Sequence, residues 1–161
     1  MAVAYLGIGS NLGNRAAQIG QVLVGLSDSG VAIEACSALY ETDAVTPDPQ
    51  PRYLNAAARV VTALSPRALL GVCLEIELGL GRSRPANRTH AAREIDVDLL
   101  LYDDAVIDEP PELVVPHPRL LERPFVRIPL ADVARPGLAH PISGDRLDTA
   151  TPDASVRRLQ P

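Results

Sequence analysis

The feature that most limits the possible folds is a short apolar segment, residues 95–102, that contains two acidic side chains. Its residues alternate with a period of two, which is typical of a β-strand. The alternation predicts that Asp96 and Asp98 share one face with Leu100 and Tyr102, with the two acids roughly 6.5–7 Å apart. Two carboxylates this close repel each other unless a cation or a proton lies between them. A hard divalent ion such as magnesium fits, because it takes oxygen ligands and commonly combines carboxylates with substrate phosphates.

The segment just before this strand is rich in arginine. Arg82, Arg84, Arg88 and Arg93 lie there, in a stretch that also contains glycine and proline. Guanidinium groups are permanently charged, forked donors that suit phosphate oxygens. Either feature alone is more often ordinary surface, a solvated strand face or a basic loop. Their adjacency favours a functional site for a metal–polyphosphate complex, because paired acids at a buried strand end seldom lack a partner.

Composition excludes several other classes of protein. The 161 residues are enough for one domain with a normal core, and we expect a single domain over residues 1–161. A net charge of −5 predicts no attraction to nucleic acid or to anionic lipid. Neither a signal-peptide pattern nor a segment long enough to span a membrane is found. Cys36 and Cys73 lie in apolar patterns without metal-ligand spacing, so we expect reduced core thiols of a cytoplasmic protein.

Periodicity predicts four strands, at residues 3–8, 31–40, 53–64 and 95–102, and two helices between them. The first helix, capped by Asn11 or Asn14, has an apolar stripe of Leu12, Ala16, Ile19, Leu23 and Leu26. The second begins at Ser65-Pro66, with Leu69, Cys73, Ile76 and Leu80 on its stripe. Glu75 and Glu77 fall largely off that stripe.

The order of these elements is β-α-β-β-α-β, which is the split βαβ arrangement of the ferredoxin-like fold. The fold class predicted is therefore α+β, with both helices on one face of a largely antiparallel sheet and the other face open to ligands. Residues 129–133 are expected to form a short helix. From about residue 135 the chain has no convincing periodicity, and we expect an irregular tail there.

Three further patterns concern ligand binding. The glycines at positions 7, 9 and 13 superficially resemble a dinucleotide-binding fingerprint, but their spacing differs and no P-loop lysine follows, so a tight turn is the better interpretation. Tyr53 and Asn55 fall on one face of a strand and could stack on and hydrogen-bond a flat heterocycle. Taken alone, such a pair is more often a packed ring and a structural amide. Prolines on both sides of His117 favour an extended, well-defined position for it.

A set of motifs in one order identifies a resemblance. They are Gly9-Ser10-Asn11-Leu12-Gly13, Tyr53-Leu54-Asn55-Ala56, Glu77-x-x-x-Gly81-Arg82-x-Arg84, Arg93-x-Ile95-Asp96-x-Asp98, and Pro116-His117-Pro118-Arg119 with Arg123-x-Phe125. Over about residues 3–130 the chain resembles the 6-hydroxymethyl-7,8-dihydropterin pyrophosphokinases of folate biosynthesis. The resemblance implies a monomeric, cytoplasmic, ferredoxin-like enzyme. It also implies transfer of pyrophosphate from ATP to the pterin hydroxymethyl group, leaving AMP, with no nucleic-acid or membrane partner.

The resemblance also assigns roles by position. Asp96 and Asp98 would hold two magnesium ions that bridge the ATP phosphates, and they form the catalytic set together with Arg82, Arg84 and Arg93. The residues implied in pterin binding are Thr42, Asp43, Val45, Tyr53, Asn55 and Phe125. The residues implied in ATP binding are Glu77, Arg84, Arg93, Leu99, Val114, His117 and Arg123.

One departure and three alternatives remain. The family loop before the acidic strand usually carries a Trp, whereas this chain has Arg88-Thr89-His90-Ala91-Ala92-Arg93, which predicts weaker closure over the site. A single-stranded RNA-binding module is one alternative, although the sequence lacks the required aromatic motif. A γ-phosphoryl kinase or nucleotide hydrolase is the second, because the same acids and arginines serve either phosphate. A relative that binds ligand without turnover is the third.

Overall fold

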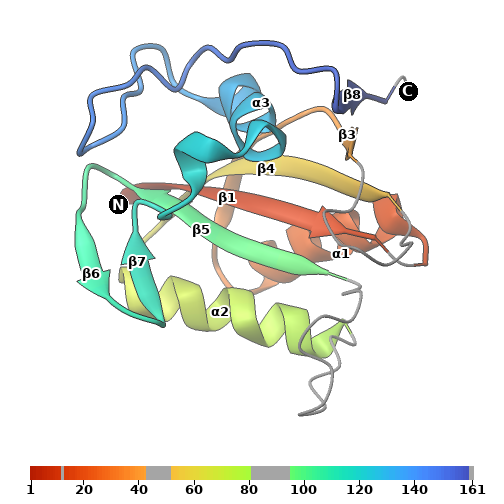
Figure 1. Ribbon diagram of the computed structural model, residues 1–161. Helices are drawn as coiled ribbons and strands as arrows, with labels where there is room; N and C mark the ends of the chain where they lie inside the picture. The colour runs from red at the N-terminus through yellow and green to blue at the C-terminus, as the bar shows by residue number, and fades with distance from the viewer. Residues whose placement is uncertain (12, 43–51, 81–94, 160–161) are drawn as a thin grey trace.

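The computed structural model describes residues 1–11, 13–42, 52–80 and 95–159. It contains a six-stranded sheet with layers of helix and loop on both faces (Figure 1). Several predicted residues lie outside the described residues: Leu12, Asp43, Val45, Arg82, Arg84 and Arg93.

The sheet is antiparallel throughout, with strand order β5-β1-β4-β3-β8 and with β2 also paired to β4. Its strands are β1 (Ala2–Ser10), β2 (Ala32–Cys36), β3 (Tyr40–Thr42), β4 (Tyr53–Thr62), β5 (Asp96–Tyr102) and β8 (Val156–Arg158). The central strand β1 lies between β4 and the acidic strand β5. In this order the single strand β1 separates the acids of β5 from the polar residues of β4.

Two helices cover one face of this sheet, α1 (Arg15–Asp28) and α2 (Pro66–Gly79) (Figure 1). Their N-termini are capped by side chains: Asn14 Oδ1 accepts a hydrogen bond from the Ala17 amide and Ser65 Oγ from the Ala68 amide. The residues that the two helices bury against the sheet include Ile19, Val22, Leu26, Leu69 and Cys73. The predicted β-α-β-β-α-β core and antiparallel sheet are confirmed. Within α1 the predicted stripe is partly wrong, because Ala16 is exposed and Val22 is buried.

The predicted strand at residues 31–40 is in fact two strands, β2 and β3, that both pair with β4. Ser37 makes the break, because its hydroxyl accepts a hydrogen bond from the Ala57 amide at 2.8 Å and donates to the Ala38 carbonyl at 2.7 Å. Side-chain bonding of this kind competes with the regular ladder. Cys36, predicted to be a core thiol, is exposed at the end of β2, whereas Cys73 is buried as predicted.

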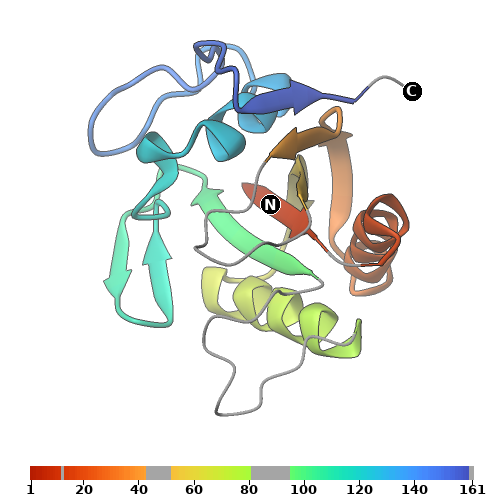
Figure 2. The same cartoon turned by 45° about the vertical axis from the view of Figure 1, so that its right-hand side comes forward.

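The face opposite α1 and α2 is only partly open. A short 3-10 helix, η1 (Leu120–Glu122), leads into α3 (Pro124–Val133), which packs on β4 and its neighbours (Figure 2). Leu120, Leu130 and Val133 form a second core with Tyr5 and Ala57. The predicted helix at residues 129–133 therefore begins earlier, with Pro124 in its first turn and Pro129 inside it. The remaining part of this face holds the candidate site.

A bulge changes the predicted alternation of β5. Leu99 pairs with Leu6 of β1 but Leu101 pairs with Tyr5, so β5 holds one extra residue at this point. As a result Leu100 and Leu101 both belong to the second core, and Tyr102 packs on the α1–α2 side. The prediction that Leu101 and Tyr102 continue the alternation is therefore wrong. Asp96 and Asp98 precede the bulge and keep their common face.

Beyond the core, β6 (Ile107–Glu109) and β7 (Leu113–Val115) form a hairpin beside α2. Arg67 of α2 is tied to this hairpin by ion pairs with Glu109 and Glu112. The tail, for which no regular element is predicted, contains β8, which pairs with β3, and it buries Leu147 in the second core. Among the described residues, no helix is both long and apolar enough to cross a membrane.

Candidate functional site

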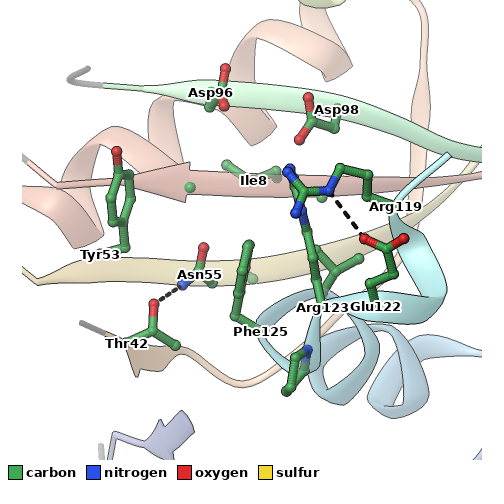
Figure 3. Close-up of a pocket in the computed structure, with 15 residues that line it drawn as sticks. Ile8, Thr42, Tyr53, Asn55, Asp96, Asp98, Arg119, Glu122, Arg123 and Phe125 are labelled. Atoms are coloured by element: carbon green, nitrogen blue, oxygen red, sulfur yellow. Dashed lines mark hydrogen bonds and ion pairs between the residues drawn. The ribbon is translucent and has the colours of Figure 1, made fainter. Parts of the chain in front are cut away.

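The open part of the sheet contains a cavity of about 440 Å³, here called the first cavity (Figure 3). β4 contributes Tyr53 and Asn55 to its lining, and β3 contributes Thr42. Phe125, from the first turn of α3, points into it from the other side. Asp96 and Asp98 lie along its far edge on β5, across β1 from these residues.

The floor of the first cavity is formed by β1, which presents glycine there. Gly9 is in register with Asp96 on one side and with Asn55 on the other, and Gly7 is in register with Asp98. A Cβ atom at Gly9 would lie 3.2 Å from Asn55 Oδ1, tighter than an ordinary contact. Because Gly7 and Gly9 have no side chains, the space between the amide of β4 and the acids of β5 stays clear. This gives the glycines at positions 7 and 9 a role other than a dinucleotide turn.

A buried hydrogen bond orients the polar end of the first cavity. Asn55 Nδ2 donates to Thr42 Oγ1 at 2.9 Å, and both residues are buried. Because this bond uses one amide proton, Asn55 Oδ1 and the second amide proton can be directed at a ligand. The guanidinium of Arg123 lies 5.6 Å from the centre of the Phe125 ring, within the range of a cation–π contact. An apolar ring beside an amide is the pairing that a flat, polar-edged heterocycle requires.

A second cavity of about 280 Å³ lies on the other side of the acids, between α2, β5 and the β7 region. It is lined by Glu77, Leu99, Val114 and His117, all of which the resemblance implied in ATP binding. Asp96 and Asp98 line this cavity as well as the first. The two acids therefore stand where the two cavities meet. Arg123, implied in ATP binding too, lines the first cavity instead.

The burial of Glu77 differs from the prediction made from the sequence. This residue was predicted to fall off the buried stripe of α2, but it is only 1% exposed. Its Oε1 accepts a hydrogen bond of 2.7 Å from the Val97 amide, which lies between the two aspartates on β5. Burial, and then the charges of Glu77 and Asp98, raise the pKa of the neighbouring Cys73 thiol to about 12. The carboxylates of Glu77 and Asp98 therefore both lie near this thiol, and a cation beside them would be favoured.

His117 is held in place by backbone contacts, and its surroundings favour the neutral imidazole. Its amide donates to the Leu100 carbonyl at 2.9 Å, and its Nδ1 accepts from the Arg119 amide at 3.2 Å. Burial, followed by the positive charges of Arg123 and Arg119, lowers its pKa below the usual value. A neutral imidazole that accepts at Nδ1 carries its proton on Nε2, where it can donate to a ligand.

The donors at the meeting of the cavities fit a magnesium ion only in part. Asp96 and Asp98 provide hard oxygen ligands on adjacent positions of one strand face. In the part of the chain that the structure describes, no group of three or more His, Cys, Asp or Glu residues could enclose a metal. A cation held by two carboxylates keeps open positions for water and for phosphate oxygens, as magnesium commonly does.

Two charged residues that line the first cavity were given no role by the sequence reasoning. Arg119 and Glu122 line the first cavity, and Arg119 Nε donates to Glu122 Oε2 at 3.2 Å (Figure 3). Their spacing of three residues is the signal that could have paired them, but their position in the cavity depends on how η1 docks on the sheet. The predicted Arg82, Arg84, Arg93, Asp43 and Val45 lie outside the described residues, so their roles stay predictions.

Comparison with known proteins gives a consistent family. The family model "7,8-dihydro-6-hydroxymethylpterin-pyrophosphokinase (HPPK)" matches residues 5–135. The chain is 42% identical over 135 residues to the 2-amino-4-hydroxy-6-hydroxymethyldihydropteridine pyrophosphokinase of Methylorubrum extorquens, covering 83% of this chain and 84% of that protein. The Bacillus subtilis enzyme of the same name is 38% identical over 134 residues, covering 83% of this chain and 78% of the relative.

Solved structures show the same fold at lower identity. The wild-type HPPK-DHPS of Plasmodium falciparum superposes with a TM-score of 0.68 at 15% identity, covering 91% of this chain. An HPPK-DHPS in complex with substrates has a TM-score of 0.62 at 13% identity, covering 82% of this chain. This chain spans 43% and 40% of the length of those two proteins.

Proposed function

Because this chain belongs to the 7,8-dihydro-6-hydroxymethylpterin-pyrophosphokinase family, we propose that its two cavities hold the two substrates of that reaction. It is a pyrophosphokinase of folate synthesis, as the sequence resemblance predicted. The pterin occupies the first cavity and ATP the second. The observation that supports this assignment is the edge at Asp96 and Asp98 that both cavities share, because ligands in the two cavities would have the ATP phosphates next to the pterin's hydroxymethyl group.

The first cavity suits the pterin. The ring lies over the glycine floor of β1, against Phe125 and Tyr53, and its polar edge meets the Asn55 amide. Thr42 supports this recognition by fixing the orientation of that amide. A ligand lacking the matching donors and acceptors leaves the buried amide unpaired, which costs about 1–3 kcal/mol per group.

The second cavity suits ATP. Its surroundings favour a neutral His117, which can donate from Nε2, and backbone groups at Leu99 and Val114 border the same space. Glu77 takes part through β5, because its carboxylate binds the Val97 amide between the two acids. Val97 is one residue from either acid, so this hydrogen bond sets the position of that strand edge.

In the reaction the hydroxymethyl oxygen of the pterin attacks the β-phosphorus of ATP. The bond from that phosphorus to the α,β-bridging oxygen breaks, AMP leaves with that oxygen, and the hydroxyl proton passes to water or to a nearby carboxylate. We assign two magnesium ions to Asp96 and Asp98, where they would neutralise phosphate charge. The chain's own residues hold the two reactants in line and need supply no nucleophile.

We further propose that the chain acts as a monomer in the cytoplasm. This follows the expectation that the sequence resemblance gave. The predicted contributions of Arg82, Arg84 and Arg93 to phosphate binding belong to the same proposal.

The test is a nucleotide-product assay with purified protein, ATP, magnesium and 6-hydroxymethyl-7,8-dihydropterin. Chromatography resolves AMP from ADP, with a reaction lacking the pterin as the control. We expect AMP that appears only when the pterin is present. Formation of ADP would instead indicate a γ-phosphoryl kinase or a hydrolase, and no product would indicate a protein that binds without turnover.

A further inference from the structure

The C-terminal strand β8 lies outside the family match, which ends at residue 135. It forms the edge of the main sheet, beside β3 (Figures 1 and 2). The pairing is antiparallel, with Val156 opposite Thr42 and Arg157 opposite Glu41. The Leu159 amide extends it by donating to the Leu39 carbonyl at 2.9 Å.

The strand that β8 covers carries a recognition residue. β3 has only three residues, and one of them is Thr42, the hydrogen-bond acceptor for the Asn55 amide. A strand this short gains few ladder bonds from one neighbour, and an unpaired edge leaves its other backbone groups to solvent. With β8 in place, β3 is paired on both sides, to β4 and to β8.

An ion-pair cluster around Glu41 ties the same strand to three other segments. Glu41 contacts Arg15 at 2.9 Å, Arg52 at 3.2 Å and Arg157 of β8 at 4.0 Å. Arg15 Nη1 also donates to the Arg52 carbonyl at 2.9 Å, which joins the start of α1 to the start of β4. The hydrogen bond from Arg15, and then that from Arg52, lowers the pKa of Glu41, although partial burial opposes the shift. The Glu41 side chain is only 17% exposed.

We propose that β8 and the Glu41 cluster form a brace that fixes β3, and with it the Thr42–Asn55 pair, for recognition of the pterin. Glu41 and Arg157 are positioning residues in this brace, since they act through Thr42. The inference rests on the proposed function for the identity of the ligand in the first cavity. The described lining of the second cavity contains no residue of β3 or β8, so binding of ATP is independent of the brace.

The first test compares point variants of the full chain. Glu41→Gln and Arg157→Gln each remove charge from the cluster, and Arg157→Lys keeps it. Arg146→Gln is the matched control, because it removes a tail ion pair, with Asp148 at 2.6 Å, that does not involve β3. The steady-state KM for the pterin, the KM for ATP and kcat are measured for each protein.

We expect Glu41→Gln to raise the pterin KM about fivefold, the size that one network of partly exposed ion pairs supports. The KM for ATP and kcat stay within about twofold of the unaltered chain. Arg157→Gln shifts the pterin KM in the same direction by less, and Arg157→Lys restores it. Equal changes in the two KM values, or the same change in Arg146→Gln, would overturn the proposal.

The second test removes β8 by ending the chain at Ser155. Circular dichroism establishes whether the shortened chain folds, and hydrogen exchange follows the Thr42 amide in both proteins. We expect faster exchange at Thr42 and a pterin KM raised about tenfold. Unchanged exchange at Thr42 in a folded, shortened chain would refute the brace. If the shortened chain does not fold, hydrogen exchange of the Thr42 amide is compared between Glu41→Gln and the unaltered chain instead. Unchanged exchange in Glu41→Gln would then refute the brace.

These readouts separate the brace from the proposed function. If the unaltered chain makes no AMP with the pterin present, the proposed function fails while hydrogen exchange still measures the brace. If the unaltered chain makes AMP and the variants behave like it in both KM and exchange, the brace alone fails.

Discussion

Replacing Thr42 with valine isolates one buried hydrogen bond of the first cavity. Valine has nearly the same shape as threonine but has a methyl group in place of the hydroxyl that accepts from Asn55 Nδ2 at 2.9 Å. Both residues are less than a tenth exposed, at 5% and 8%, so water cannot freely replace the lost acceptor. Leaving a buried donor unsatisfied costs about 1–3 kcal/mol. For a chain of this length each kcal/mol lowers Tm by about 2–4 °C.

We therefore expect Thr42→Val to lower Tm by about 4–8 °C for a cost near 2 kcal/mol. The pterin KM should rise about tenfold, because the Asn55 amide loses the contact that orients it. The KM for ATP should stay unchanged. Differential scanning calorimetry measures the first effect, and the AMP assay at varied pterin and ATP measures the other two.

A threonine-to-valine substitution at Thr62, at the end of β4 that is far from Asn55, provides a matched control. Thr62 is 1% exposed, and its hydroxyl accepts a hydrogen bond from the Leu64 amide at 3.0 Å, away from both cavities. Thr62→Val should also lower Tm but leave the pterin KM unchanged. A similar rise of the pterin KM in both variants would show that the effect is general destabilisation. No loss of stability in Thr42→Val would refute the argument from the buried amide.

Three further predictions concern the acids, the glycine floor and a buried phenol. Asp96→Asn or Asp98→Asn should lower turnover at least ~100-fold with Tm unchanged, since charge at the phosphates is lost; near-normal AMP formation would remove the metal assignment. Gly9→Ala should raise the pterin KM, because its Cβ would lie 3.2 Å from Asn55 Oδ1, whereas Gly20→Ala, with nothing within 4 Å, should not; equal KM values in the two would contradict this. Burial, and then the hydrogen bond to Asp132, raise the pKa of Tyr40 to about 12. Because this folded-state pKa exceeds that of the unfolded chain, stability should fall as the pH rises from about 10 to about 12. In Tyr40→Phe, the free energy of unfolding, measured with denaturant at each pH, should no longer fall between these pH values. The same fall in this variant would show that another group is responsible.

Much of the fold could be predicted because local signals agreed with the tertiary structure. Ser65-Pro66 carries its own start signal for α2, and the alternation before Asp98 needs only the strand period to put two acids on one face. Tyr53 and Asn55 were also placed correctly on one face of β4, because no bulge interrupts the pairing of that strand with β1.

The failures share a physical cause, which is that the deciding partner is distant in the sequence. Glu77 of α2 is buried because the Val97 amide, on strand β5, satisfies its carboxylate. The bulge before Leu101 depends on the register with β1, and β8 forms because β3 offers it an edge. The residue pattern within each of these segments gives no information about a partner elsewhere in the chain. The second core likewise arises from where α3 docks, which its own sequence does not determine.

The most direct test of the central claim is a crystal structure of the chain with magnesium, a non-hydrolysable ATP analogue and 6-hydroxymethyl-7,8-dihydropterin. We expect the pterin in the first cavity with its polar edge on Asn55, the nucleotide in the second cavity near His117, and metal with phosphate between them at Asp96 and Asp98. A nucleotide base seated on Asn55, or phosphates bound away from the two aspartates, would contradict this claim.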